Sequence, residues 1–325
     1  MLTHPLVTVI VPNYNHARFL KQRLDSIFNQ TYTNFEVIFL DDNSTDNSLD
    51  LLNSYHDARI AHKIYNNTNS GSPFKQWKKG LELAKGELIW IAESDDWAEV
   101  TFLDKMVSVF RDFENVAVAY CDLYNVDEDG KVLGIEHFHY NHDKFGQNNH
   151  YELGSDFVIK YMLSATSIVN ASSVLFVKEY GLKHIDKILD FRMAGDWLFW
   201  NAILSENKVN VFYWGQDKLN FFRHSLQSTR NFPTIEKKQN GLIERSNVLF
   251  STLKMYNIDQ EKISIKKREL LDWWSKDHNI SEMLDSSFLR ILEIPLFQDK
   301  NVIDLYKHYI RYRIKNLPLI KAMRN

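Results

Sequence analysis

Short apolar runs alternate with helix-like patterns through the first 125 residues of the chain. Five runs are continuously apolar, which is typical of strands that are covered on both faces. The predicted strands are 7–11, 35–40, 60–65, 88–92 and 116–120. Helical periodicity lies near 18–30, over 46–55, in a segment ending near 85, and near 102–113. Strands that alternate with helices at this spacing indicate right-handed crossovers, so the pattern predicts an α/β fold with a mostly parallel central sheet.

The pattern changes twice along the rest of the chain. It weakens from about 126 to 155, where "HFHYNHDKFGQNNHYEL" predicts an irregular loop over a site. It returns with predicted strands 172–177 and 209–213 around a helix at 196–204. After about residue 231 only helical patterns follow. We therefore predict an α/β domain over 1–230 and a helical C-terminal region over 231–325.

Composition excludes several classes of protein. The 325 residues are 44% hydrophobic and 14% aromatic, enough for a substantial core and too much for a disordered chain. A net charge of −3 gives no electrostatic case for nucleic-acid binding. One cysteine excludes an internal disulfide, and no segment looks like a signal peptide or a membrane span. We expect a cytoplasmic protein.

Polar side chains follow three of the predicted strands. These are Pro12-Asn13-Tyr14-Asn15, Asp41-Asp42-Asn43-Ser44 and Glu93-Ser94-Asp95-Asp96. Ligands of open parallel sheets bind beyond the carboxyl ends of the strands, where these groups are expected to meet. Because three carboxylates in four residues repel one another, something positive is expected beside the third group.

A divalent metal would supply that positive charge. Mn²⁺ and Mg²⁺ prefer oxygen ligands and bind through one or two carboxylates together with substrate phosphates. We therefore expect the metal at Asp96, with Asp95 beside it. In the alternative interpretation the two aspartates only cap the next helix. Asp42 lies in "DDNSTDNS", whose polar residues could serve only as helix caps. In the other interpretation Asp42 accepts hydrogen bonds from a nucleobase or ribose.

Two segments in the first part of the chain resemble a known family. The segments "VTVIVPNYNHARFLKQRLDSIFNQTYTNFEVIFLDDNSTDNS" and "GLELAKGELIWIAESDDW" resemble the start of a family 2 glycosyltransferase with the GT-A fold. The resemblance is specific over about 6–125, thins over 126–190 and resumes to about 229. It implies a nucleotide-sugar donor. The nucleotide-binding residues would be Pro12, Asn13, Tyr14, Asn15, Asp42, Lys75 and Asp95.

The resemblance also implies the metal site. Asp95 and Asp96 stand where the family has Asp-x-Asp, with Asp96 as the direct ligand, although this chain has Ser-Asp-Asp. Lys75 belongs to "NSGSPFKQW", which replaces the family's Asn-x-Gly followed by Ala-Arg-Asn. It would take over a phosphate or ribose contact; the alternative is a solvated lysine.

The second half of the chain supplies the rest of the implied site. In "FRMAGDWLFW", Asp196 stands in the context of the family's catalytic aspartate and would deprotonate the acceptor; the alternative is an N-cap. "FFRHSLQSTR" resembles the family's Arg-x-His-x-x-Ser, so Arg223, His224 and Ser228 would contact the diphosphate or the acceptor. The alternative is a strand end with an exposed arginine and histidine.

Together these features predict an inverting, metal-dependent glycosyltransferase that uses a UDP-sugar. The acceptor would be a glycan or a lipid-linked glycan in bacterial surface polysaccharide synthesis. One alternative is a non-catalytic partner of the same fold that binds glycan or nucleotide. The other is a sugar nucleotidyltransferase, although "PNYNHARF" offers no Gly-rich, basic loop after the first strand.

The C-terminal segment is basic. From Lys300 to Asn325 seven Lys and Arg residues stand against Asp304 alone. A basic amphipathic segment can lie on an anionic membrane surface, which would place the protein at the inner face of the cell membrane. A solvated helix end or an oligomer contact remains the alternative.

Overall fold

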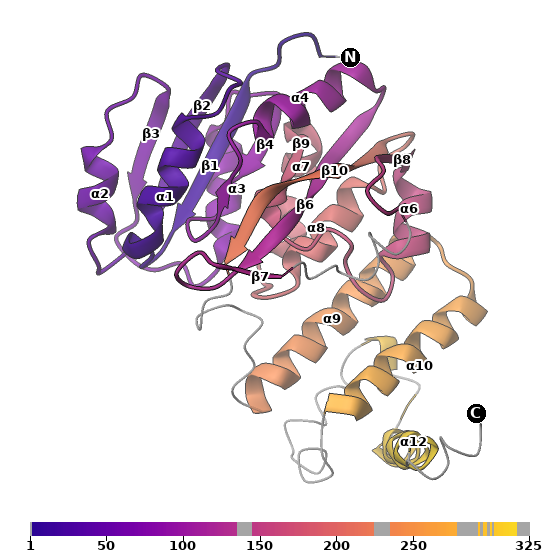
Figure 1. Cartoon of the computed structure of the whole chain (residues 1–325). Coiled ribbons are helices and arrows are strands. Elements are labelled where there is room, and N and C mark those ends of the chain that lie inside the picture. The colour runs from indigo at the N-terminus through magenta and orange to yellow at the C-terminus, as the bar shows by residue number, and fades with distance from the viewer. Residues whose placement is uncertain are drawn as a thin grey trace. The chain divides into compact units, whose positions relative to one another are not determined.

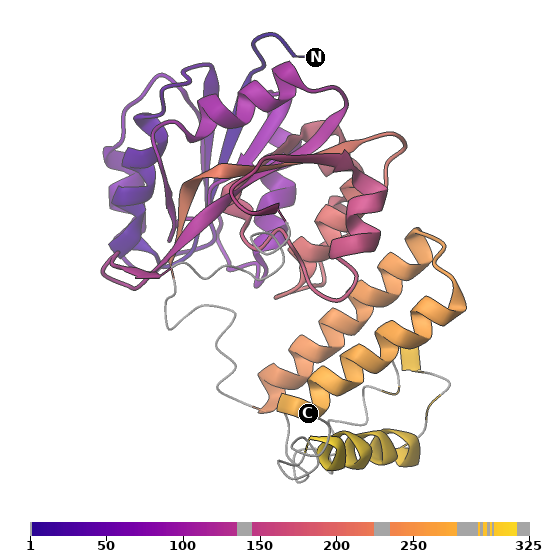
Figure 2. The same ribbon diagram turned by 45° about the vertical axis from the view of Figure 1, so that its right-hand side comes forward.

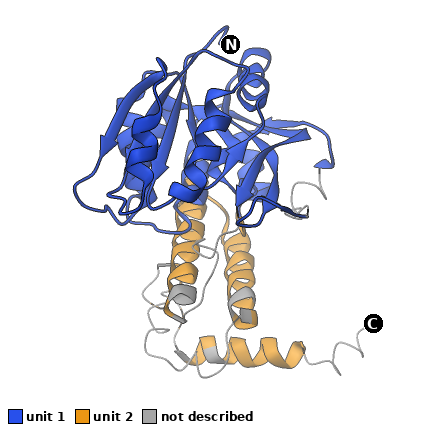
Figure 3. Ribbon diagram, turned by 60° about the vertical axis from the view of Figure 1, so that its left-hand side comes forward, with its two compact units in different colours: residues 1–162, 166–228 blue, residues 163–165, 229–325 orange. Residues whose placement is uncertain are grey.

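The fold is described from a computed structural model. It covers residues 2–134, 145–223, 235–277, 292, 295–297, 300 and 302–316. Two compact units make up the chain, residues 1–162 with 166–228 and residues 163–165 with 229–325 (Figure 3). The predicted boundary after residue 230 lies in 224–234, outside the described residues.

The first unit contains a ten-stranded sheet flanked by helices (Figure 1). The strand order is β3-β2-β1-β4-β9-β6-β10-β5, with β7 on β6 and β8 on β10. The strands are β1 Val7–Asn13, β2 Phe35–Asp41, β3 Ile60–Tyr65, β4 Leu88–Ile91, β5 Trp97–Ala98, β6 Val116–Val126, β7 Val132–Gly134, β8 His150–Leu153, β9 Val174–Val177 and β10 Asn210–Arg223. The helices are α1 Ala17–Phe28, α2 Ser48–Ser54, α3 Pro73–Leu83, α4 Phe102–Asp112, α6 Gly154–Tyr161, α7 Lys178–His184 and α8 Gly195–Ile203, with 3-10 turns η1 Ala171–Ser173 and η2 Ile185–Ile188.

The predicted parallel arrangement is confirmed for one half of the sheet. Strands β3, β2, β1 and β4 are all parallel. Beyond β4 the sheet is mixed, because β9 runs antiparallel to both β4 and β6 while β10 runs parallel to β6. The three polar strand ends all belong to the parallel half.

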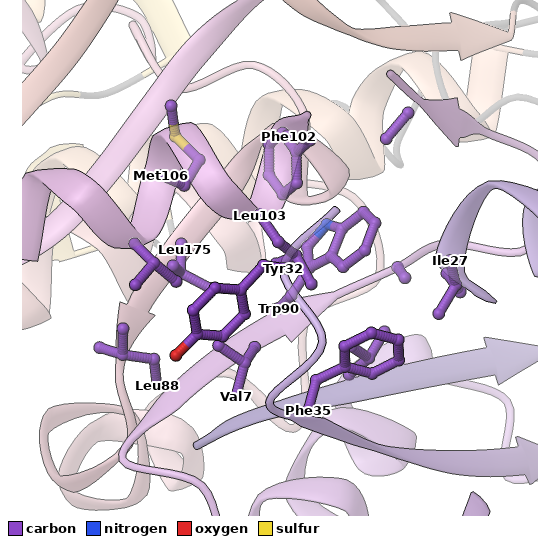
Figure 4. Close-up of a cluster of buried hydrophobic side chains, with 14 of the residues drawn as sticks. Val7, Ile27, Tyr32, Phe35, Leu88, Trp90, Phe102, Leu103, Met106 and Leu175 are labelled. Atoms are coloured by element: carbon purple, nitrogen blue, oxygen red, sulfur yellow. The ribbon is translucent and has the colours of Figure 1, made fainter. Parts of the chain in front are cut away.

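Apolar side chains explain why these strands lie in the middle of the unit. Every residue of β1 and β4 is buried. On one face, Val7 of β1 and Trp90 of β4 pack with Phe102 and Met106 of α4 (Figure 4). On the other face, Ile10 meets α3, where a Cβ at Gly80 would lie 2.5 Å from Ile10 Cγ2. Glycine at this position lets α3 pack closely against β1.

The second unit is helical, as the periodicity predicts. Helices α9 (Ile235–Met255) and α10 (Gln260–Asp277) form a hairpin, visible in Figure 2, and α12 (Val302–Lys315) packs on α10. With the 3-10 turn η4 (Pro295–Phe297) they enclose a small core. Its buried members are Leu163, Leu242, Leu249, Leu253, Leu271, Leu296, Phe297, Leu305 and Tyr309. None of the helices in the described ranges has the length and apolar character needed to cross a membrane.

Candidate active site

The parallel strands bring the three polar strand ends together. Asn13, the last residue of β1, lies opposite Asp41 of β2 and donates from Nδ2 to Asp41 Oδ2 at 2.8 Å. The next link joins the segment after β1 to the loop after β4, where the His16 ring and Ser94 Oγ are 2.8 Å apart. The expected meeting of these groups at one sheet edge is confirmed.

The acidic loop after β4 does not cap a helix. Helix α4 begins only at Phe102, with Thr101 as its N-cap, and β5 lies in between. The capping interpretation of Asp95 and Asp96 is therefore wrong. Their carboxylates must be explained by contacts within the loop.

Asp96 and Asp95 lie in different environments. Asp96 is 1% exposed, and its oxygens accept hydrogen bonds from Asn170 Nδ2 at 2.9 Å and from the Arg223 backbone N–H at 3.0 Å. Asp95 is partly exposed, and its carboxylate accepts no hydrogen bond from any residue that the structure describes. The contacts therefore leave Asp95 more open to an external ligand than Asp96, the expected direct metal ligand.

The positive group beside these carboxylates is Arg23, which the sequence prediction missed. Arg23 is fully buried in α1, its Nε donates to the Glu93 carbonyl at 2.8 Å, and its Nη2 lies 4.0 Å from Asp96 Oδ2. Neither Nη atom has a hydrogen-bond partner within the described part of the chain. The signal was present in the sequence, because Arg23 follows Leu20 by three residues on the apolar face of α1.

Arg23 does not fully compensate the negative charge. Burial, reinforced by Asp95, raises the pKa of Glu93 to about 8, although Trp77 Nε1 donates to its carboxylate at 2.9 Å. Burial and Asp95 also raise the pKa of Asp96 to about 6, against the lowering effect of Arg23. Burial itself lowers the pKa of Arg23 to about 10, which still leaves it charged at neutral pH. The site would thus accept further positive charge.

The residues fit a divalent cation that is held by few protein ligands. Among the described residues no group of three or more His, Cys, Asp or Glu side chains forms a metal cage. Mg²⁺ and similar ions are commonly held by one or two carboxylates together with substrate phosphates and water. The open carboxylate of Asp95, beside two carboxyls with raised pKa values, matches that donor set.

Asp42 organises the loop that follows β3. The Asp42 carboxylate accepts hydrogen bonds from Asn66 Nδ2 at 2.6 Å, Gln76 Nε2 at 2.7 Å and Ser70 Oγ at 2.8 Å. The Ser70 N–H adds a bond of 2.9 Å. Asp42 is only 6% exposed, so its main visible role is to fix residues 66–72 at the sheet edge.

The other predicted nucleotide residues differ in accessibility. Pro12 and Asn13 are buried, Asn15 is partly exposed and adopts a positive φ of 55°, and Tyr14 is 45% exposed. Tyr14 therefore offers a ring face at this edge. Lys75 is exposed, and its Nζ donates to the Ser70 carbonyl at 3.0 Å.

Arg223 has contacts that contradict the expected role. Its side chain is directed into the protein, and the residue is 3% exposed. It donates to the carbonyls of Asp95 (2.9 Å), Asp127 (3.1 Å) and Glu128 (2.6 Å) and to Gln22 Oε1 (2.7 Å). Neither the predicted diphosphate contact nor an exposed strand end fits these bonds, because the guanidinium donors are used within the protein, one of them on the acidic loop. His224 and Ser228 lie outside the described residues.

Asp196 is the second residue of α8 and is partly exposed. The N-cap of α8 is Ala194, and Asp196 Oδ1 accepts from the Trp197 N–H at 2.8 Å, so Asp196 lies in the first turn rather than at the cap. A carboxylate is favoured there by the helix dipole. Two features fix this turn beside α3. The backbone at Gly195 lies so close to the Phe74 ring that a Cβ there would be 2.6 Å from it. In addition, Ser72 Oγ donates to the Phe191 carbonyl at 3.2 Å.

Comparison with known proteins agrees with the glycosyltransferase resemblance. Residues 8–165 match the family model described as glycosyl transferase family 2. The chain is a glycosyltransferase, and over these residues it is similar to family 2. This glycosyltransferase is 25% identical over 319 residues to the glycosyltransferase GlyG of Streptococcus pneumoniae serotype 4, covering 94% of this chain and 89% of the relative. It is 29% identical over 215 residues to WfaP of Escherichia coli, a UDP-Glc:alpha-D-GlcNAc-diphosphoundecaprenol beta-1,3-glucosyltransferase, covering 64% and 76% of the two chains.

Solved structures confirm the predicted GT-A fold. TarS 1–349 of S. aureus in complex with UDP-GlcNAc aligns with a TM-score of 0.62 at 17% identity, covering 96% of the glycosyltransferase and 93% of TarS. The mannosyltransferase PcManGT of Pyrobaculum calidifontis in complex with GDP-Man and Mn²⁺ aligns with a TM-score of 0.53 at 16% identity, covering 97% and 88%.

Proposed function

We propose that this glycosyltransferase moves a sugar from a UDP-sugar to a hydroxyl of a glycan or lipid-linked glycan, with inversion and with Mn²⁺ or Mg²⁺. The observation that carries the proposal is the open carboxylate of Asp95 in the loop after β4, on the sheet edge that also carries the exposed ring of Tyr14 and the loop fixed by Asp42. The name of WfaP and the complex of TarS with UDP-GlcNAc support a UDP-linked donor, and the name of WfaP supports a lipid-linked acceptor.

On the donor side we assign the binding of the nucleobase to Tyr14 and its neighbours Pro12, Asn13 and Asn15. Asp42 positions the 66–72 loop for the base or ribose. Lys75, exposed on the first turn of α3, would contact ribose or phosphate. The complex of PcManGT with Mn²⁺ and GDP-Man supports a metal beside the diphosphate.

Asp95 would hold this metal directly. When bound, the metal stabilises the departing nucleoside diphosphate as a Lewis acid. Asp96, Arg23 and Arg223 then act as positioning residues, because their bonds fix the loop that carries Asp95.

On the acceptor side we assign the role of catalytic base to Asp196. Asp196 accepts the proton of the acceptor hydroxyl while that oxygen forms a bond to the anomeric carbon from the face opposite the diphosphate. The bond between the anomeric carbon and the phosphate oxygen breaks, and its electron pair leaves with UDP. A base must lie within hydrogen-bond reach of the proton it removes, and a partly exposed carboxylate can meet that condition.

The test is a turnover screen of UDP-sugars with oligosaccharide and lipid-linked acceptors, with UDP release and product anomer as readouts. We expect release that needs an acceptor and Mn²⁺ or Mg²⁺, gives the inverted anomer, and falls at least about 100-fold in Asp196→Asn. UDP binding without turnover would overturn the proposal in favour of a non-catalytic partner. Pyrophosphate release from UTP and a sugar phosphate would overturn it in favour of a nucleotidyltransferase.

We place this activity in bacterial surface polysaccharide synthesis, in the cytoplasm and at the inner face of the cell membrane. The relation to WfaP, whose name specifies a diphosphoundecaprenol acceptor, supports that setting.

A further inference from the structure

Helix α12 presents an apolar strip to solvent. Leu305 and Tyr309 are 1% and 5% exposed and pack in the core of the second unit, so they define the inner face of the helix. Ile303 and Ile314 are 62% and 50% exposed. At 3.6 residues per turn these two isoleucines lie within about 20° of each other and about 17 Å apart along the axis. The side of α12 that faces away from Leu305 therefore carries both isoleucines, with Lys307 next to them.

Cations line one edge of this strip. Lys307, Arg311 and Lys315 recur every fourth residue, and all three are exposed. Asp304 is the one acid in the sequence of α12. Aligned isoleucines with a basic edge are typical of helices that lie in the plane of an anionic membrane surface.

The exposure of the isoleucines is high for this protein. Ile303 has the largest exposed fraction among the large hydrophobic side chains in the described part of the chain. A single exposed isoleucine would need no explanation, but two on one helix face beside three cations form a patch.

We propose that the α12 face, defined as Ile303, Lys307, Arg311, Ile314 and Lys315, docks on an anionic phospholipid bilayer. Apolar side chains would enter the headgroup boundary while the cations remain at the level of the lipid phosphates. This inference names the surface and the lipid chemistry of the expected membrane contact. It rests on α12 alone, so it stands or falls separately from the proposed donor and reaction.

Charge decides between a membrane and a second copy of the chain. A two-fold dimer through the α12 face would bring the same patch of two copies together, each with three cations against Asp304, so like charges would predominate across it. An anionic lipid surface instead complements these cations.

Vesicle flotation of the full chain tests the proposal. The probes are vesicles that mix phosphatidylglycerol with phosphatidylcholine, and vesicles of phosphatidylcholine alone. We expect flotation with the anionic vesicles only. The variant Lys307→Gln/Arg311→Gln/Lys315→Gln should lower the partition coefficient about 100-fold, and Ile303→Glu/Ile314→Glu at least about tenfold.

Matched controls lie on other helices of the same unit. Ile265 of α10 is 47% exposed, so Ile265→Glu tests an equally apolar position. Lys254→Gln/Arg268→Gln/Lys276→Gln removes three exposed cations outside α12. Both controls should float like the native chain. Equal losses in controls and α12 variants, or no flotation of the native chain, would overturn the proposal. So would a native dimer in analytical ultracentrifugation that the isoleucine variant dissociates.

Discussion

Arg23 is a cation held inside the first unit by one hydrogen bond and by three nearby carboxylates. Its Nε fixes the Glu93 carbonyl, and its charge lies beside Asp96. The clustered acids correctly predict positive charge at this place, although from sequence alone all of it is expected from a metal. The structure supplies part of that charge from α1.

We expect Arg23→Met to lower the free energy of unfolding by about 3–5 kcal/mol, because it leaves buried carboxylates without their partner. Urea unfolding of the metal-free protein measures this. Arg18→Met is the matched control: Arg18 lies on the same helix, is exposed, and pairs with Glu128 and Asp129 at the surface, so its loss should be about 0–1 kcal/mol. Equal losses in the two variants would contradict the role assigned to Arg23.

Site residues could be predicted from sequence by type and position but not by environment. Asp95 and Asp96 are neighbours in the chain, yet only the fold shows that Asn170 and Arg223 enclose one and leave the other open. The sequence predicts a ligand contact for Arg223 because "FFRHSLQSTR" resembles the family's Arg-x-His-x-x-Ser. Its partners Gln22 and Glu128 are about 200 and 95 residues away, which no local pattern reveals.

At the scale of elements, α3 positions the helix that carries the proposed base. Trp77 of α3 donates to Glu93 and packs against Phe199 and Trp200 of α8. The start of α8 approaches Phe74 so closely that only glycine fits at residue 195. Helix α3 thus links the sheet edge proposed to bind the donor with the helix that carries Asp196.

We expect Gly195→Ala to lower kcat, because the new methyl group would displace the first turn of α8 and with it Asp196. The cost in stability should be about 1–3 kcal/mol, as for other overpacked positions. Steady-state kinetics and thermal melting measure the two effects. The second-site change Phe74→Leu should restore much of both, and a double variant no better than Gly195→Ala would refute this account of the contact.

The elements themselves were largely predictable, since apolar runs and helical periods mark them. Strand direction was not: 172–177 reads as one more buried strand, whereas the structure has η1 followed by β9, which runs antiparallel to its neighbours. A continuous apolar run fixes burial on both faces and leaves direction open. Part of the irregular stretch near 126–155 forms β7 and β8, and 135–144 lies outside the described residues.

For the whole molecule, the raised pKa values of Glu93 and Asp96 make stability depend on pH. The folded protein keeps a proton on Glu93 up to about pH 8, whereas the unfolded chain releases it near its ordinary value of 4.5. The folded state therefore binds more protons in this window, and the free energy of unfolding falls as pH rises through it.

Without metal we expect the melting temperature to fall between about pH 5 and pH 8, the window set by Glu93. Differential scanning calorimetry over that range measures the slope. Glu93→Gln should flatten it, and Mn²⁺ with UDP should raise the melting temperature most at the alkaline end, where the carboxylates are charged. A metal-free protein that becomes more stable from pH 6 to pH 8 would contradict the assigned shift.

The central claim is that Asp95 holds a metal that binds the diphosphate of the donor. Calorimetric titration with UDP, with and without Mn²⁺, tests it on the native chain, Asp95→Asn and the surface control Asp129→Asn. We predict tighter binding with Mn²⁺ for the native chain and the control, and at least a tenfold loss in Asp95→Asn, about 1.4 kcal/mol. Asp95→Asn that binds UDP and Mn²⁺ as tightly as the native chain would contradict the claim.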